Sequence, residues 1–284
     1  MKDIFIVSRK RADTPITWNA FPDKYKERTQ FVVWEDDAQD YISAFGKEHV
    51  EVIPLKYIEE KDIHLGSKRN YIYYKFMHPH MVFDDDLTIS RRYTNPPEKR
   101  PPIFVQKYLT SDNVDHFDEF FDDMFNIPTK QPGYNWGGIT YESVPPSLLF
   151  EEFRFGKVIG TYYFNRPVLP NNIDFARFPT AEDQYINLEF NLQGFPSGVY
   201  YKHVQSEKKG HAAPGGCNIY RTIESERRVC QDLKKAYPKY VKIRQKIQSS
   251  GKLKGQTRTT VIIYNKKAYN DYLKTNVKNK LIVT

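Results

Sequence analysis

The sequence predicts an α/β protein with a mostly parallel sheet, flanking helices and a basic C-terminal helical extension. In the first hundred residues, short apolar runs alternate with stretches of helical character, the order that is typical of βαβ units. The 284 residues are enough to bury a full core, and 21 Tyr, 19 Phe and 3 Trp are too many for a disordered chain. We expect residues 1–220 to form one domain and residues 221–284 to pack on it or extend it.

The first predicted elements are four strands and two helices. The strands are apolar and rich in β-formers, and each ends in polar residues: they cover residues 4–7, 31–34, 50–54 and 81–83. Residues 38–45 carry Tyr41 and Phe45 four positions apart, which indicates a helix. A second helix is expected over residues 69–76, after a start signal at Gly66 and Ser67.

The later elements are less regular. Aromatic residues at helical spacing predict a helix over residues 113–125, and residues 94–102 contain four prolines and indicate a loop. The remaining elements are strands over residues 150–164, a helix over 182–193, a strand over 198–203, two basic helices separated at Pro238, and a last strand over 259–264.

The net charge of +8 is unevenly distributed. Residues 221–284 contain 17 Lys and Arg against 4 Asp and Glu, a balance of +13, whereas residues 1–220 contain 26 against 31, a balance of −5. A mildly acidic body with a strongly basic tail favours a protein that acts on a polyanion. A solvated basic surface that maintains solubility explains the same charge equally well.

The cysteine count and the apolar runs exclude several classes of protein. Two cysteines, Cys217 and Cys230, cannot form a disulfide scaffold or a four-cysteine zinc site, and they indicate a reducing compartment. No apolar stretch approaches the length of a membrane span, and the start is too short for a signal peptide. We therefore expect a cytoplasmic protein without a membrane partner.

Three consecutive acids, Asp84, Asp85 and Asp86, directly follow the fourth predicted strand. Ligands of open α/β sheets bind at the carboxyl ends of strands, and carboxylates there can hold a hard divalent cation that neutralises a diphosphate. Alternation along an extended chain puts Asp84 and Asp86 on one side. The pattern predicts a metal–nucleotide site, although a solvated acidic turn gives the same three letters.

Polar residues at other element ends support this site. Ser8, Arg9 and Arg11 follow the first strand, and Glu35 and Asp36 follow the second. An arginine at position 69, near the start of its helix, would point its guanidinium at a phosphate. Each of these residues alone is an ordinary surface group, so the prediction depends on their joint placement.

In this order, the segments at residues 4–9, 33–35, 66–70 and 83–86 resemble the nucleotide-sugar half of a GT-A glycosyltransferase. Residues 135–138 (Asn-Trp-Gly-Gly) resemble the acceptor-side loop of that family, and residues 180–183 resemble its acidic motif. The opening strand with Ser8-Arg9, and the late Gly215-Gly216 followed by Arg221, are most similar to the phage DNA-base glycosyltransferases called TET-associated. The likeness spans about residues 4–221.

The resemblance implies a Rossmann-like GT-A fold and a metal-dependent enzyme, located in the host cytoplasm if a phage encodes it. The donor would be a nucleotide diphosphate sugar, UDP-sugars first, and the acceptor a hydroxymethylated pyrimidine in DNA. Mn²⁺ or Mg²⁺ would be held by Asp84, Asp86 and His203. The implied donor-binding residues are Ser8, Arg9, Arg11, Glu35, Arg69, Asp84, Asp85, Trp136, Gly137 and Gly138.

The resemblance also implies roles in catalysis. Asp183 would be the general base of an inverting enzyme, with Glu182 as the second candidate; in a retaining enzyme, Asp183 would bind donor hydroxyls instead. Trp136 or Tyr134 would stack on a base that has left the duplex, unless Trp136 is a core residue. His211, in the small-residue loop at 210–216, could close over the donor.

Other functions remain open at this point. A nucleotidyltransferase would use the same sheet, but it needs a Gly-rich phosphate loop, and residues 8–15 contain no glycine. A non-catalytic nucleic-acid-binding protein explains the basic tail but not two separate acidic motifs. A metal-dependent nuclease would need its carboxylates clustered with a lysine. A protein or polysaccharide acceptor is compatible with the same donor site.

Overall fold

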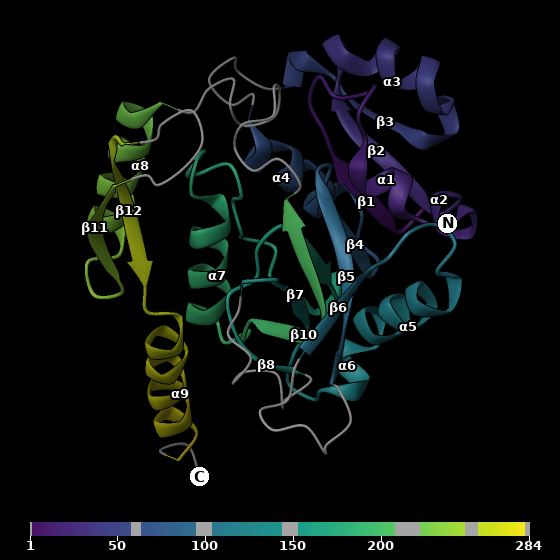
Figure 1. The fold of residues 1–284 in the computed structure, drawn as a ribbon. Helices are drawn as coiled ribbons and strands as arrows, with labels where there is room; N and C mark the ends of the chain where they lie inside the picture. The colour runs from purple at the N-terminus through teal and green to yellow at the C-terminus, as the bar shows by residue number, and fades with distance from the viewer. Residues whose placement is uncertain are drawn as a thin grey trace.

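The computed structural model describes residues 2–57, 64–94, 104–143, 153–207, 222–247 and 255–281. Within these residues, a large mixed sheet with helices against both faces forms the body, and a two-stranded sheet with two helices lies beside it (Figure 1). The predicted α/β class, a large sheet flanked by helices, is confirmed.

The large sheet runs in the order β3-β2-β1-β4-β9-β7-β10-β5-β6, with β8 paired to β10. The first four strands in this order are parallel to one another, and β7 is parallel to β10. The strands of this sheet are β1 (Ile4–Val7), β2 (Thr29–Trp34), β3 (Val50–Ile53), β4 (His80–Asp84), β5 (Leu87–Thr94), β6 (Phe104–Tyr108), β7 (Trp136–Tyr141), β8 (Phe153–Phe155), β9 (Thr161–Phe164) and β10 (Gly198–Glu207).

The helices cover the two faces of this sheet and extend into the C-terminal part. They are α1 (Ile16–Ala20), α2 (Asp23–Lys26), α3 (Ala38–Phe45), α4 (Leu65–Lys75), α5 (Val114–Phe125), α6 (Ile127–Lys130), α7 (Glu182–Leu192), α8 (Ile223–Ala236) and α9 (Asn265–Leu281). The helices predicted over residues 38–45, 69–76, 113–125 and 182–193 correspond to α3, α4, α5 and α7. None of the described helices is both long and apolar enough to cross a membrane.

Two hydrophobic cores lie on opposite faces of the sheet, as alternation along β1 shows. Phe5 and Val7 belong to the core that includes residues of α4 and α7, whereas Ile4 and Ile6 belong to the core that includes residues of α2, α3 and α5. All four side chains are buried, because successive side chains of a strand point to opposite faces. The sheet is therefore covered on both sides, as its parallel part requires.

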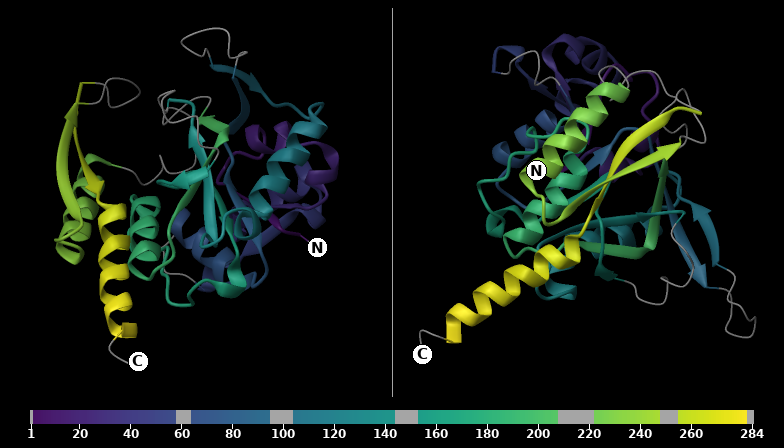
Figure 2. Two further views of the ribbon diagram at one scale, coloured as in Figure 1. Left: turned by 90° about the horizontal axis from the view of Figure 1, so that it is seen from below. Right: turned by 90° about the vertical axis from the view of Figure 1, so that its left-hand side faces the viewer.

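The C-terminal module, defined here as residues 222–247 and 255–281, contains α8, α9 and the antiparallel hairpin of β11 (Val241–Ile247) and β12 (Thr257–Ile263). Its buried residues Leu233, Val241 and Ala268 belong to the same core as Tyr185 of α7. In two further views, the module lies beside α7, away from the N-terminal strands (Figure 2). The module packs directly on the body.

One prediction in this region is wrong. The segment after Pro238 forms strand β11 instead of a second basic helix. Val241, Ile243 and Ile247 occupy alternate positions, and their β-branched side chains favour a strand once β12 supplies a partner. The late strand predicted over residues 259–264 is confirmed as β12.

Candidate functional site

A cavity of about 450 Å³ lies where the body meets the C-terminal module. It opens at the carboxyl ends of β1 and β4, at the N-terminal turn of α7, and against β12. Nine predicted site residues line it: Ser8, Arg9, Arg11, Arg69, Asp84, Asp85, Asp86, Glu182 and Asp183. The two acidic motifs, about a hundred residues apart in the chain, therefore face one cavity.

The three acids occupy the end of β4 and the turn into β5. Asp84 is the last residue of β4, and Thr17 of α1 fastens the turn: its backbone N–H donates to the carbonyl of Asp85, and its hydroxyl donates to the carbonyl of Asp84, at 2.7 Å. The turn then continues into β5, because Leu87 N–H donates to the Thr17 hydroxyl at 3.0 Å. These bonds hold the three carboxyl groups at the strand end.

Burial and mutual repulsion raise the pKa of two of these acids. The pKa of Asp84 rises to about 7, chiefly because it is buried, with further contributions from Asp86 and Glu182. Burial and the charge of Asp85 raise the pKa of Asp86 to about 6. Burial and the neighbouring carboxylates therefore disfavour the ionised forms of Asp84 and Asp86.

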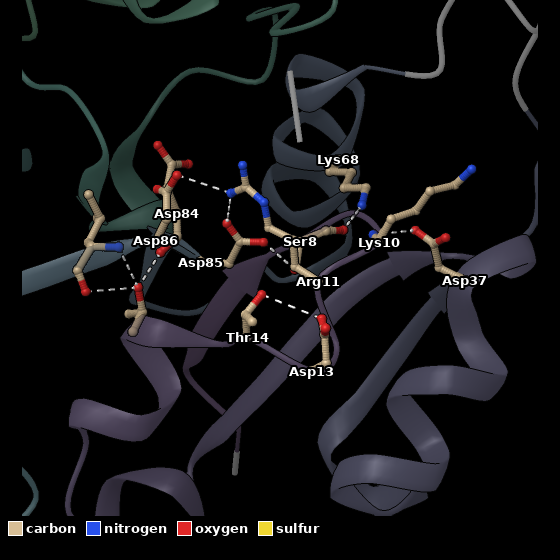
Figure 3. Close-up of polar contacts among 12 residues, drawn as sticks. Ser8, Lys10, Arg11, Asp13, Thr14, Asp37, Lys68, Asp84, Asp85 and Asp86 are labelled. Atoms are coloured by element: carbon tan, nitrogen blue, oxygen red, sulfur yellow. Dashed lines mark hydrogen bonds and ion pairs between the residues drawn. The ribbon is translucent and has the colours of Figure 1, made fainter. Parts of the chain in front are cut away.

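Arg11 and Ser8 hold the turn from the β1 side, as Figure 3 shows. Arg11 Nη1 lies 2.6 Å from Asp85 Oδ1 and 3.0 Å from Asp86 Oδ2. The Ser8 hydroxyl donates to Asp85 Oδ2 and contacts the hydroxyl of Tyr41. Asp85 is 5% exposed, so its carboxylate is fully engaged in positioning Ser8 and Arg11.

Arg69 connects the two acidic motifs. From α4, it bonds Asp84 of β4 through Nη2 and Glu182 of α7 through Nη1, the latter at 2.6 Å. Its guanidinium also lies over the ring of Tyr162, 4.7 Å from the centroid. A planar guanidinium suits this bridging role, because its fork can bond two carboxylates at once.

Glu182 and Asp183 differ in their freedom to act as a base. Glu182 is 7% exposed and is bonded by Arg69. Asp183 is partly exposed and lines the cavity, and its carboxylate lies 3.3 Å from Lys157 Nζ. Asn187, one turn later in α7, donates to the backbone carbonyl of Asp183 and fixes the start of the helix.

Lys68 is an unusual cation of the cavity wall. It is 2% exposed, donates to the backbone carbonyl of Ser8 (Figure 3) and lies over the Trp34 ring at 5.5 Å. Burial lowers its pKa to about 7. Arg9, Arg11, Arg69 and Arg258 each pair with a carboxylate, but no described carboxylate lies within ion-pair distance of Lys68. Its ammonium retains donors for an anionic or carbonyl group of a ligand.

Four predicted donor-binding residues do not line the cavity. Glu35 is exposed and accepts from Leu55 N–H at 3.2 Å. Trp136 is fully buried, donates from Nε1 to the carbonyl of Phe195 and packs in the core. It is therefore a core residue and does not stack on a ligand. At Gly137 and Gly138, an added Cβ would meet backbone oxygens at 2.6 and 2.2 Å, so close strand packing accounts for these two glycines.

His203, predicted to complete the metal site, also lies away from the cavity lining. It is 1% exposed in β10, packs against Phe120 of α5 with ring centroids 5.2 Å apart, and places Nε2 3.9 Å from Glu119 Oε2. Burial lowers its pKa to about 3. Its side chain therefore belongs to the core on the α5 face of the sheet.

Several lining residues were not predicted. Tyr141, Tyr162 and Glu207 come from β7, β9 and β10. The C-terminal module supplies another group: Glu226, Cys230, Arg258, Thr259, Thr260 and Val261. Arg258 and the buried Glu226 form an ion pair. In the sequence, Arg258 is one basic residue among many, and no local pattern marks it as part of a cavity.

Two predictions lie partly or wholly outside the described residues. These residues are His211, the loop at residues 210–216, Cys217 and Arg221.

Cys230 is buried and forms no disulfide among the described residues, and burial raises the pKa of its thiol to about 11. A thiol in that state is a poor nucleophile.

The described cavity lining carries more acids than bases. It contains five Lys and Arg and seven Asp and Glu side chains. Within the described ranges, no group of three or more His, Cys, Asp and Glu side chains is arranged to hold a metal ion. Because the acids outnumber the bases by two, a bound cation would bring the formal charge of the described lining closer to neutral.

Comparison with protein-family models identifies the family of the chain. A family model described as TET-Associated Glycosyltransferase matches residues 2–216. The match covers the large sheet and both acidic motifs and ends before the C-terminal module. A search of curated proteins gave no match.

Proposed function

The chain belongs to the TET-associated glycosyltransferase family, and from this premise we propose that it moves a sugar from a nucleotide diphosphate sugar to a hydroxymethylated pyrimidine in DNA. Membership makes the protein a glycosyltransferase, which displaces the nucleotidyltransferase, nuclease and non-catalytic alternatives. The donor and acceptor are the parts that we propose. The observation that carries the proposal is the single cavity that Asp84–Asp86 and Glu182–Asp183 share through Arg69.

The donor fits the cavity by position, and a bound divalent cation would balance the charge of its diphosphate against the negative lining. Its diphosphate would lie beside the acidic turn, and Lys68 would bond a phosphate or base oxygen at the end of β1. Arg9, which pairs with Asp36 and Asp37, and Ser8 would border the nucleoside. We take UDP-sugars as the first donors to test.

A divalent cation, Mn²⁺ or Mg²⁺, would bind at Asp84 and Asp86. Both carboxyl groups are half-buried at the cavity wall, and a hard cation bound there would favour the ionised forms that burial and the neighbouring acids disfavour. Mg²⁺ is usually held by one or two carboxylates and by substrate phosphates, which suits a site without a cluster of three protein ligands among the described residues. Such a cation stabilises the charge that develops on a leaving diphosphate.

Asp183 would accept the proton of the acceptor hydroxyl in an inverting reaction. Its carboxylate lines the cavity and, among the described residues, forms an ion pair with Lys157, whereas Arg69 engages Glu182. Glu182 would then position Arg69 and, through it, Asp84. The hydroxyl oxygen would bond the anomeric carbon as the bond from that carbon to the diphosphate breaks.

The test compares Asp86→Ala with the exposed control Asp112→Ala, using transfer of radiolabelled sugar to hydroxymethylated DNA. We expect Asp86→Ala to lose transfer and metal-stimulated donor hydrolysis while its melting temperature shows that it remains folded. Asp112 lies in the turn before α5, so its variant should behave as the wild type. Full activity of Asp86→Ala would remove the metal assignment.

A further inference from the structure

One face of the β11–β12 hairpin extends from solvent to the cavity. In the antiparallel register, Lys246 lies opposite Arg258, and Arg244 lies opposite Thr260. Directly opposed residues of such a pair share a face of the sheet. Arg258 and Thr260 line the cavity, whereas Lys242, Arg244 and Lys246 occupy alternate, exposed positions of β11. We call the face that carries these three cations the cationic face.

The cationic face carries charge that the described acidic side chains do not pair with. Among the described residues, no carboxylate pairs with Lys242, Arg244 or Lys246, whereas Arg227 and Lys239 of the same module pair at 2.9 and 2.8 Å. Between Asp232 and Asp271 the sequence has eleven Lys and Arg and no acid. A positive potential of this kind attracts a polyanion.

The spacing of the three cations suits a phosphodiester backbone. Alternate residues of an antiparallel strand are about 7 Å apart, so the row spans about 14 Å. One strand of a B-form duplex has a phosphate every 3.4 Å along the axis, or roughly four phosphates over that distance. A two-stranded ribbon is also narrow enough to enter the major groove.

We propose that the cationic face binds the phosphodiester backbone of the acceptor DNA and thereby brings the acceptor hydroxyl to the cavity beside Arg258. The identity of the acceptor rests on the proposed function. The geometry supplies the rest: Arg258 and Thr260, which line the cavity, lie on the same face of one hairpin as the residues that would bind phosphate, outside the matched family region. The C-terminal module is then the acceptor-binding part of the enzyme.

The test is a DNA-binding measurement on two triple variants of the full-length protein. The first, K242Q/R244Q/K246Q, removes the cationic row. The matched control, K235Q/K266Q/K274Q, removes the same charge from exposed positions of α8 and α9. The probe is a short fluorescein-labelled duplex that contains 5-hydroxymethylcytosine, and its anisotropy is followed from 50 to 200 mM NaCl.

We expect the first variant to lose about three units of salt slope and roughly 100-fold in affinity near 100 mM salt, because each lost phosphate contact lowers the slope by about 0.9. The control should keep the wild-type slope. Both variants should bind UDP-sugar with unchanged affinity, since no substituted residue lines the cavity.

Equal weakening of DNA binding in both variants would assign the effect to net charge and overturn the proposal, as would a wild-type slope in the first variant. Failure of the proposed function gives a different result. Wild-type protein would then transfer no sugar to DNA from any donor, while the binding comparison would still decide whether the cationic face contacts the backbone.

Discussion

Replacing Lys68 by methionine should stabilise the free protein and weaken donor binding. The ammonium is 2% exposed, and its pKa falls from 10.5 to about 7 on folding. A tenfold change in an ionisation constant is worth about 1.4 kcal/mol, so burial of this group costs roughly 4 kcal/mol at pH 7. Methionine removes this cost, but it also loses the hydrogen bond to the carbonyl of Ser8, which lowers the stability by about 1–3 kcal/mol.

The net stabilisation of about 1–3 kcal/mol corresponds to a melting temperature higher by roughly 2–8 °C. The size of this effect depends on pH. In the unfolded chain, Lys68 keeps its proton up to its ordinary pKa of 10.5, whereas in the folded chain it loses the proton near pH 7. The free-energy cost of burying Lys68 therefore decreases as the pH rises from 7 to 10.5. The advantage of Lys68→Met should therefore be full at pH 7 and small at pH 10.

Donor binding should change in the opposite direction. A charge-assisted bond contributes about 1.5–3 kcal/mol, so Lys68→Met should raise the dissociation constant for UDP-sugar by roughly 10- to 100-fold in calorimetry. Lys47→Met, at an exposed position, serves as the control for both measurements. A lower melting temperature together with unchanged donor affinity would refute the assignment of Lys68 as a ligand-binding cation.

Three further predictions follow from the site and the core. Asp183→Asn should lower the rate constant for transfer by about 10²–10⁴-fold with little change in donor affinity, as measured by single-turnover transfer; an equal loss in Glu182→Gln alone would exchange their roles. Trp136→Ala should lower the free energy of unfolding by about 3–5 kcal/mol in urea, because the indole is fully buried, while donor affinity of the folded fraction persists. Asp86→Asn should raise the melting temperature of metal-free protein at pH 8 and leave it nearly unchanged near pH 4. Because the pKa of Asp86 is raised to about 6 in the folded protein, its ionised carboxylate destabilises the fold increasingly from pH 4 to pH 6 and fully above pH 6. A pH-independent effect of that substitution would contradict the assigned cause.

Local patterns were sufficient for the part of the site that lies at strand ends. Asp84 ends β4 and Ser8 follows β1; these two strands are adjacent and parallel, so their carboxyl ends meet at one edge. Glu182 is the first residue of α7, Arg69 lies one turn into α4, and both side chains line the same cavity as Asp84. For these residues, a short run of sequence was sufficient to predict the strand or helix and to place the residue at the end that faces the cavity.

The remaining positions depended on long-range packing. His203 lies in a correctly predicted strand, but its side chain packs against Phe120 of α5, and that partner could not be read from residues 198–203. Arg258 reaches the cavity only because α8 and α9 place the hairpin against the body. The prediction of a helix after Pro238 followed the basic character of this segment, whereas Val241 and Ile243 alternate with its cations at the period of a strand, which β12 completes by pairing with it.

The most direct test of the central claim is anomalous diffraction at the manganese edge from a crystal soaked with MnCl₂ and UDP. We predict one peak in the cavity, within about 2.2 Å of a carboxylate oxygen of Asp84 or Asp86 and beside the diphosphate of the nucleotide. A nucleotide bound in this cavity with no manganese peak near either carboxylate, or a nucleotide bound elsewhere on the protein, would contradict the claim.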